Sequence, residues 1–326
     1  MARANAMLLR LGVSGALIGL LAWRLDAQAL RDAFAAPAPG WLWLALLISV
    51  PQVMLSAWRW RLTARRMGLT LSLRRAVAEY YAATFLNQVL PGGVVGDATR
   101  AWRHAQSSLD RARAWRAVVI ERLSGQVMLL LIALVGLAAA PALRDSLTAL
   151  FFRLGNASWT GLVAGIAGLA ALALWACRRP PAWLRHTLHD LEVALVASSV
   201  WLWQSLGSLG VVASYIAIYA IAARAIGADI ALSTLLPLIP PVLMVMAIPL
   251  SVAGWGLREG AAALVWMGAG LDPAQGVAIS LVYGVIVLVS SLPGAWLLCR
   301  RRPPRQGRDT PPPGAPPPGA PLTSER

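Results

Sequence analysis

Long apolar runs alternate with short Arg-rich stretches along most of this chain. Runs long enough to cross the ~30 Å hydrocarbon core of a bilayer lie near residues 8–23, 41–57, 117–139, 159–176, 196–223 and 276–298. Trp pairs at the two ends of the run 41–57, Trp41 with Trp43 and Trp58 with Trp60, are typical of interfacial aromatic belts. The pattern predicts an all-α polytopic membrane protein, a helix bundle with about six full spans.

The composition supports this fold class. Apolar residues make up 58% of the chain and charged residues only 13%, whereas soluble domains carry about 25% charge. The net charge of +15 comes from 29 Arg, with no Lys. These Arg lie between the apolar runs and not on one polar face, which argues against a nucleic-acid partner. The two Cys and three His show no disulfide or metal-ligand spacing, so we expect no metal and no other cofactor.

The distribution of Arg predicts the topology. The segment 58–80 contains six Arg, the segment 99–116 contains five, and six more follow Leu298. By the positive-inside rule these segments are cytoplasmic, so we expect a multi-pass protein of the bacterial inner membrane with both termini in the cytoplasm. Residues 1–29 are either a retained first helix, which Arg10 favours, or a cleaved signal peptide, and cleavage would leave the remaining topology unchanged.

Two segments interrupt the regular pattern of spans. Residues 80–98 lie between two Arg-rich segments, so they should enter the membrane and leave on the same side, as a re-entrant hairpin. Residues 226–275 must begin and end outside, as a hairpin that is either re-entrant or made of one broken and one short span. Pro and Gly mark both breaks, in LPGG at 90–93 and PLSVAGWG at 249–256. Two interrupted segments of opposite orientation predict an inverted repeat with a binding site at its interface, as in many transporters.

The two breaks carry the candidate binding chemistry. A helix that restarts inside the membrane exposes free N–H groups, which together with the helix dipole favour an anion. Gly92 and Gly93 would let a phosphate approach the backbone. Arg100 follows on the cytoplasmic rim, and Arg258 lies in the second hairpin. Amides and carboxylates nearby would hold a cationic or hydroxylated head group: Asn87, Gln88, Asp97, Glu121 and Glu259. The combination suits an anionic phospholipid or a lipid-linked sugar as the bound partner.

Charges inside apolar sequence also have a purely structural interpretation. Each charge at mid-bilayer costs about 2.5–3.5 kcal/mol, so it needs a partner or water in either case. Adjacent residues point to different sides of a helix. We therefore expect Arg122 to pair across helices, with Asp97 or Glu259. Pairing within Glu121-Arg122 or within Arg258-Glu259 is the less favoured arrangement.

Three motifs, in this order, carry a resemblance to a known family: NQVLPGGVVGDATRAWR at 87–103, VVIERLSG at 118–125 and IPLSVAGWGLREGA at 248–261. The chain resembles the lysylphosphatidylglycerol synthase transmembrane-region family, flippase-like proteins similar to the membrane half of multiple peptide resistance factors. The resemblance covers nearly the whole chain. It implies a polytopic inner-membrane bundle with broken helices that moves or handles a lipid head group. Val94, Val95 and Ala253 depart from it, because relatives often have glycine there. The matching residues, which would bind the head group, are Asn87, Gln88, Pro91, Gly92, Gly93, Gly96, Asp97, Arg100, Glu121, Arg122, Gly254, Gly256, Arg258 and Glu259.

Three functional hypotheses follow from these features. The first is a flippase-like protein that binds and translocates a phospholipid or lipid-linked head group. The second is a membrane accessory subunit, or an enzyme, of lipid glycosylation or modification, for which Asp97 and Glu259 form the evident carboxylate pair. The third is a structural partner without a site of its own.

The domain organisation favours the first hypothesis. We expect residues 1–300 to form the transmembrane domain and the Pro-rich residues 301–326 to form a disordered cytoplasmic tail. That tail is too short for the catalytic domain of a synthase, so we expect no enzyme activity, although a partner enzyme of lipid modification would fit.

Overall fold

The structure is a computed structural model that describes residues 38–90, 93–141, 144–146, 148, 182–193, 201–247 and 254–300. Within these residues the regular secondary structure is helical, which confirms the all-α fold class. The predicted spans 8–23 and 159–176, the segment 1–29 and the tail 301–326 lie outside the described residues. The helical segments are α3 (Pro39–Arg66), α4 (Leu73–Val89), α5 (Val95–Gln106), α6 (Arg111–Ala139), α9 (Ala182–Leu191), α10 (Trp201–Ala225), α11 (Leu232–Met244), η2 (Val245–Ala247), α12 (Leu257–Gly268) and α13 (Pro273–Arg300).

Four of the described helices are long and apolar enough to cross a membrane: α3, α6, α10 and α13. They correspond to the predicted spans 41–57, 117–139, 196–223 and 276–298, so the chain is a multi-pass membrane protein. α3 continues past its apolar run to Arg66, because Arg is a good helix former. It ends before Gly68, which adopts a φ of 76° that other residues rarely take. α6 starts where the Asp110 carboxylate accepts a hydrogen bond from the Arg113 amide at 2.9 Å.

The described helices show the same succession of lengths twice: one long helix, two short helices and one long helix. The long helix α3, with 28 residues, is followed by the short helices α4 and α5, with 17 and 12, and then by α6, with 29. The long helix α10, with 25 residues, is followed by α11 and α12, with 13 and 12, and then by α13, with 28. Gly93 in the first break and Gly254 and Gly256 in the second have φ values of 59°, 84° and 85°.

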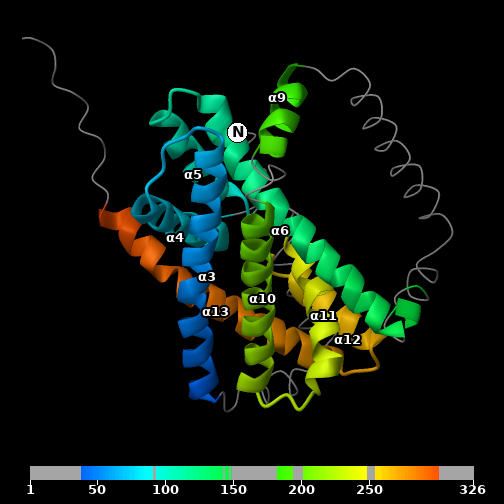
Figure 1. The fold of residues 1–326 in the computed structure, drawn as a ribbon. Helices are drawn as coiled ribbons and strands as arrows, with labels where there is room; N and C mark the ends of the chain where they lie inside the picture. Colours follow the sequence, from blue (N-terminus) through cyan, green and yellow to red (C-terminus); the bar gives the residue numbers. More distant parts are fainter. Residues whose placement is uncertain are drawn as a thin grey trace, which may run out of the picture.

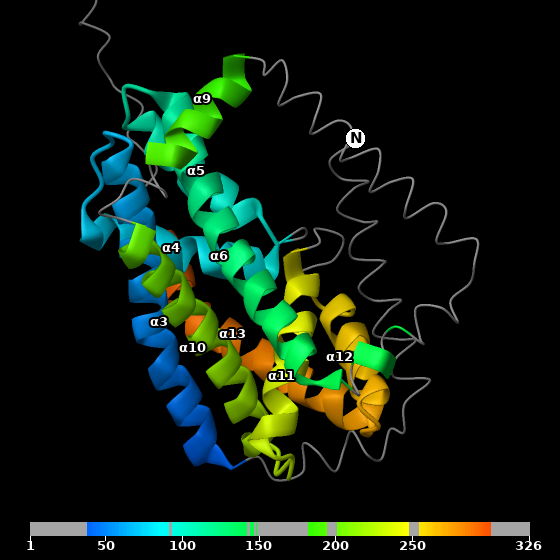
Figure 2. The same ribbon diagram turned by 45° about the vertical axis from the view of Figure 1, so that its right-hand side comes forward.

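The first long helices of the two sets, α3 and α10, lie side by side and run antiparallel (Figures 1 and 2). The Ala38 amide donates to the Ala225 carbonyl at 2.8 Å, so α3 begins where α10 ends. Further along, a Cβ on Gly207 would lie 2.9 Å from Cγ of Arg59, and one on Gly210 would lie 2.9 Å from Cδ2 of Leu55. Small residues thus allow close packing of two membrane helices.

The last helix, α13, contacts both pairs of short helices (Figure 1). Near its start, a Cβ on Gly276 would lie 2.8 Å from the Trp266 ring of α12. Near its end, a Cβ on Gly294 would overlap the Tyr81 carbonyl of α4. α13 therefore packs against backbone or ring atoms at two distant points of the bundle.

The Arg-rich segments meet at one end of the bundle. Arg113 Nη1 donates to the Met67 carbonyl at 3.4 Å, which joins the start of α6 to the end of α3. Arg116 pairs with Asp190 of α9 at 2.6 Å. Asp190 lies shortly after residues 177–186, a stretch of the sequence that contains three further Arg.

The prediction for the Trp pairs is only partly right. Trp41 and Trp43 are exposed at the start of α3, as expected for a belt. The interfacial prediction for Trp60 is wrong, because its ring is completely buried between helices. α3 continues beyond Trp60 to Arg66, so this residue lies inside the bundle and not at its edge.

Candidate functional site

The break between α4 and α5 is held by the side chain of Asn87. Asn87 Oδ1 accepts a hydrogen bond from the Gly96 amide at 2.7 Å, and Asn87 Nδ2 donates to Asp97 Oδ2 at 2.9 Å. Gly96 packs directly on the Ala83 carbonyl of α4, where any Cβ would overlap that backbone. Asp97 is thereby fixed in the first turn of α5, where the helix dipole favours a carboxylate.

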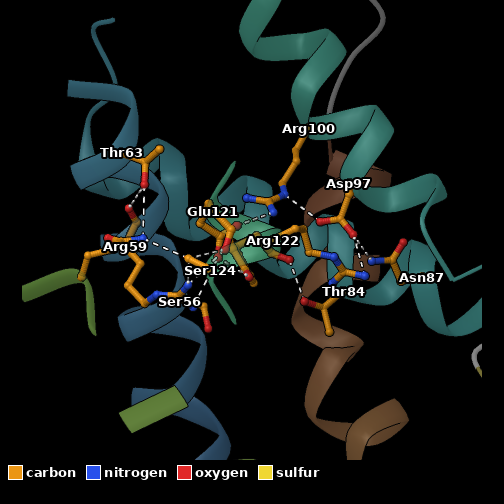
Figure 3. A network of polar contacts seen from close by, with 12 residues as sticks. Ser56, Arg59, Thr63, Thr84, Asn87, Asp97, Arg100, Glu121, Arg122 and Ser124 are labelled. Atoms are coloured by element: carbon orange, nitrogen blue, oxygen red, sulfur yellow. Dashed lines mark hydrogen bonds and ion pairs between the residues drawn. The ribbon is translucent and has the colours of Figure 1, made fainter. Parts of the chain in front are cut away.

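Asp97 belongs to a buried network of charges that joins α5 to α6 (Figure 3). Arg100 Nε lies 2.9 Å from Asp97 Oδ1, and Arg100 Nη2 lies 2.7 Å from Glu121 Oε2. Arg122 Nη2 lies 3.2 Å from Asp97 Oδ2 and 3.5 Å from the Gly93 carbonyl in the break. The expected cross-helix pair of Arg122 with Asp97 is therefore confirmed. Glu121 pairs with Arg100 and not with its neighbour Arg122.

A third Arg reaches the same network from α3. Arg59 Nη1 lies 3.5 Å from Glu121 Oε1, and Arg59 Nη2 donates to the Glu121 carbonyl at 3.0 Å and to Ser124 Oγ at 2.7 Å. Figure 3 shows Arg59 and Arg100 approaching Glu121 from opposite sides. Tyr80 of α4 adds a hydroxyl donor to Glu121 Oε1 at 3.3 Å. Helices α3, α4, α5 and α6 all contribute to the environment of one carboxylate.

Arg100 lies at the centre of this network, buried and not exposed at a rim. Its side chain is fully buried, and its guanidinium carbon lies 4.8 Å from the Trp60 ring centre and 4.5 Å from that of Tyr80. Two aromatic faces and two carboxylates therefore share one cation. The rim prediction is wrong because α5 packs inward, with Arg100 on its buried face.

A cavity of about 170 Å³ lies beside the network, large enough for several waters or a small polar group. The polar residues of the wall include Gln52, Arg59, Gln88, Asp97, Glu121 and Arg122. Apolar side chains of α6, α10, α11 and α13 complete it, including Leu129, Val212, Leu243 and Val287. Gly93 and Met246, each close to one of the two breaks, also line it. The cavity is thus bounded by both sets of helices.

The third motif forms a separate, closed cluster. Glu259 Oε2 accepts from the Gly256 amide at 2.6 Å and so caps α12. Its Oε1 lies 2.6 Å from Arg258 Nη2 and accepts from Ser280 Oγ of α13 at 2.9 Å. Arg258 and Glu259 are both buried, and neither lines the cavity. Tyr283, which does line it, has its ring centre 5.3 Å from the Arg258 guanidinium carbon.

The expectation that Arg258 and Glu259 would not pair with each other is wrong. Both lie in the first turn of α12, and the Glu259 side chain folds back over the helix end to reach the Gly256 amide. That position brings its carboxylate beside the preceding Arg258, although neighbours in the middle of a helix diverge.

Comparison with known families identifies the architecture. The sequence model described as the lysylphosphatidylglycerol synthase TM region matches residues 7–294. The chain belongs to this family. No curated protein gives a significant match to the chain. The family connects the protein with lipid modification or translocation in a membrane, and it confirms the resemblance seen in the three motifs.

The three motifs of this lysylphosphatidylglycerol synthase TM-region protein have different places in the structure. Residues that line the cavity are Asn87, Gln88, Gly93, Asp97, Glu121 and Arg122. Gly96 and Arg100 do not line the cavity. Gly96 packs against the Ala83 carbonyl, and Arg100 links Asp97 to Glu121. Gly254, Gly256, Arg258 and Glu259 form the closed cluster at the start of α12. Pro91 and Gly92 lie outside the described residues.

Sequence reasoning missed several polar residues of the cavity. Gln52 lines the cavity, and its signal is an amide within the apolar run 41–57, because a polar residue in a membrane span indicates function. Arg59 was assigned to a cytoplasmic segment, because the apolar run gives no sign that α3 continues to Arg66. Nothing in the sequence indicates that Tyr80 would contact Glu121.

The geometry favours binding over two-carboxylate chemistry. Asp97 faces the cavity, whereas Glu259 is saturated by the Gly256 amide, Arg258 and Ser280 and does not reach it. The structure does not bring the predicted carboxylate pair together. What it does assemble is a charged cavity lined by residues of the candidate spans α3, α6, α10 and α13.

Proposed function

We infer that this protein binds a lipid head group in the cavity between the two helix breaks and moves it between the leaflets, without chemical change to the lipid. One observation carries the proposal: Arg59, Asp97, Glu121 and Arg122 line a cavity inside a bundle that contains four candidate spans. Charged groups at membrane depth are costly and are a functional signal by default. A phospholipid or a lipid-linked sugar is the substrate class.

The proposed membrane topology agrees with the contacts at the Arg-rich end. The end of α3, the start of α6 and α9 are joined through Arg113 and Arg116. If this end is cytoplasmic, α4 and α5 enter and leave on the cytoplasmic side as a re-entrant hairpin, while α11 and α12 do so from outside. Both termini are then cytoplasmic and the membrane is the bacterial inner membrane.

An inverted repeat is supported by the recurring helix lengths and by matched contacts. α3 to α6 and α10 to α13 follow the same order, and their first helices run antiparallel. Arg100 of α5 contacts Glu121 of α6, while Glu259 of α12 contacts Ser280 of α13, with a sequence separation of 21 residues in both cases. Substrate sites at the interface of such repeats are common in transporters.

Reconstitution tests the function directly. Purified full-length protein is placed in vesicles with head-group-labelled lipids in both leaflets, and a membrane-impermeant reagent destroys the label outside. Transport exposes label from the inner leaflet and lowers the protected fraction below the roughly half that protein-free vesicles retain. An Asp97→Asn variant should slow this loss, whereas Asp145→Asn, at an exposed site, should not. Protection equal to that of empty vesicles for every lipid would refute transport. A chemically altered lipid would support an enzyme instead.

Cysteine accessibility tests the re-entrant arrangement. In a background with Cys177 and Cys299 replaced by Ser, the exposed positions Arg74 and Gln106 flank the first hairpin, and Asp229 lies beyond the end of α10. Single Cys at 74 and 106 should react with an impermeant reagent from the same side of the membrane. A Cys at 229 should react from the other. Labelling of 74 and 106 from opposite sides would mean that α4 and α5 cross the membrane.

A further inference from the structure

The charges around the cavity do not cancel. Among the described residues, the connected network contains Arg59, Arg100 and Arg122 but only the carboxylates Asp97 and Glu121. The network therefore has one positive charge in excess. The pair of Arg103 with Glu79 brings one charge of each sign, so it leaves this excess unchanged. A single uncompensated charge in an apolar bundle calls for an anion or for water.

The excess charge is most accessible at Arg122. The Arg100 side chain is fully buried between two carboxylates, and that of Arg59 is 3% exposed, whereas the Arg122 side chain is 38% exposed and lines the cavity. Arg122 also has the weakest attachments, at 3.2 Å to Asp97 and 3.5 Å to the Gly93 carbonyl. Its guanidinium is thus the group that an entering anion meets, and phosphate oxygens match its fork of donors.

Two amides in the same wall have unused hydrogen-bonding groups. Gln52 Nε2 on α3 and Gln88 Oε1 on α4 are buried and have no hydrogen-bond partner among the described residues. The two side chains are 8% and 9% exposed, and both line the cavity. Leaving a buried polar atom unpaired costs about 1–3 kcal/mol. One of these atoms is a donor and the other an acceptor, and a hydroxyl group can satisfy both kinds.

We propose that the cavity selects a lipid whose head group combines a singly anionic phosphodiester with a free hydroxyl, with Arg122 binding the phosphate and Gln52 and Gln88 binding the hydroxyl. The inference rests on the proposed lipid-binding function and specifies its substrate class. It excludes head groups with net positive charge, such as an aminoacylated one, because these would add to the existing excess. Zwitterionic head groups without hydroxyls should also bind more weakly than an anionic head group with a hydroxyl.

Four lipids test separately the need for a negative charge and the need for a hydroxyl in the head group. Phosphatidylglycerol has the negative charge and hydroxyls, and phosphatidylmethanol has the charge alone. Lysylphosphatidylglycerol has a hydroxyl but a net positive charge, and phosphatidylcholine has neither feature. Binding of each lipid to the purified full-length protein in detergent is measured by native mass spectrometry and by the shift in unfolding temperature. Phosphatidylglycerol should bind tightest, phosphatidylmethanol about fivefold more weakly, and the other two at least about tenfold more weakly.

Variants test whether Arg122 binds the phosphate and whether Gln52 and Gln88 bind the hydroxyl. Arg122→Gln should weaken the binding of both anionic lipids about tenfold, while Arg122→Lys should retain the preference for anionic lipids. Gln52→Met and Gln88→Met should lower the affinity for phosphatidylglycerol to that for phosphatidylmethanol. The affinity for phosphatidylmethanol should not change. Arg111→Gln and Gln106→Met alter exposed residues outside the cavity and serve as matched controls. Size-exclusion profiles establish that each variant is folded.

The outcomes distinguish this inference from the proposed function. If labelled lipids cross the membrane but all four bind equally, transport stands and the selectivity proposed here is wrong. Tightest binding of lysylphosphatidylglycerol would also overturn it. Soluble glycerophosphoglycerol provides the same head group without acyl chains, and it should bind far more weakly than the lipid. Equal binding would identify a free phosphodiester as the ligand and overturn the lipid assignment.

Discussion

Arg100 Nη2 and Glu121 Oε2 lie 2.7 Å apart, with both side chains almost completely buried, and this contact joins the first two family motifs. Removing the cation alone should be costly, because Glu121 and Asp97 each lose their closest charged partner and keep only Arg59 at 3.5 Å and Arg122 at 3.2 Å. We expect Arg100→Met to lower the free energy of unfolding by about 3–5 kcal/mol. The double variant Arg100→Met with Glu121→Met should recover part of this loss, and thermal unfolding in detergent measures both. An equally large loss for the partly exposed Arg103→Met would show that burial of the pair is not the cause.

Gly96 should tolerate no side chain. Its added Cβ would overlap the Ala83 carbonyl, so Gly96→Ala must push α5 away from α4 and break the hydrogen bond to Asn87. We expect a loss of about 3 kcal/mol in unfolding free energy and reduced lipid binding. Gly40 of α3 has open space around its Cβ position, so Gly40→Ala should be neutral or slightly stabilising. Similar unfolding temperatures for the two variants would contradict the close contact.

Ser280 should matter for stability more than other serines of α13. Its hydroxyl donates to Glu259 and accepts from Arg258, so Ser280→Ala leaves both buried charges under-satisfied. The expected loss is about 1–3 kcal/mol in unfolding free energy. Ser291→Ala is the control, because Ser291 donates only to the Leu288 carbonyl of its own helix. A smaller effect at 280 than at 291 would argue against the closed cluster.

Asp97 competes with an anionic ligand for Arg122. Asp97→Asn retains the size of the side chain but removes its charge, so Arg122 is freed and the network gains a second excess positive charge. We expect severalfold tighter binding of phosphatidylglycerol, together with lower thermal stability of the ligand-free protein. Lipid titrations monitored by native mass spectrometry, with Asp145→Asn as control, measure the change. Weaker binding in Asp97→Asn would mean that Asp97 itself contacts the ligand.

Acidification should weaken the fold through His104, which lies near the end of α5 outside the four candidate spans. Burial lowers the pKa of His104 below its ordinary value, while its ring packs edge-on against Trp60 at 5.5 Å. Arg75 acts in the same direction, and Thr70 and Glu79 oppose it. The unfolded chain then binds a proton near pH 6.5 when the folded chain does not, so stability falls by up to about 1.4 kcal/mol per pH unit below that point.

The measurement compares unfolding temperatures at pH 7.5 and 5.5 for wild type and two variants. His104→Gln should show a smaller decrease than wild type. His186→Gln, at an exposed position of α9, should show the same decrease as wild type. Identical decreases in all three proteins would assign the pH dependence to other groups.

The sequence predicts the long helices well, because α3, α6, α10 and α13 depend on local apolar composition. It also predicts the two interruptions, since Pro and Gly act within the segment that contains them. Asp97 with Arg122 was predictable from the cost of an unpaired charge in lipid. The wrong expectations for Trp60, Arg100 and the Arg258-Glu259 pair share a cause. Each depends on how one helix end packs against another, and periodicity along a single helix does not contain that information.

The same limit explains why the polar wall of the cavity was only half anticipated. Asn87, Gln88 and Asp97 lie within one motif, so the sequence predicts them as a group, whereas Gln52 and Arg59 come from a helix with no motif. Their contribution arises only when α3 is placed beside α4 and α6. A polar residue in a span indicates that some partner exists, but not which helix provides it.

The two glycine contacts of α13 have a mechanical consequence. Because its backbone meets the Trp266 ring at Gly276 and the Tyr81 carbonyl at Gly294, neither neighbour can shift while α13 stays still. In a close-packed interior such contacts transmit displacement instead of absorbing it. A tilt of α13 therefore moves α4 and α12 together, so that a displacement beside one helix break is felt beside the other.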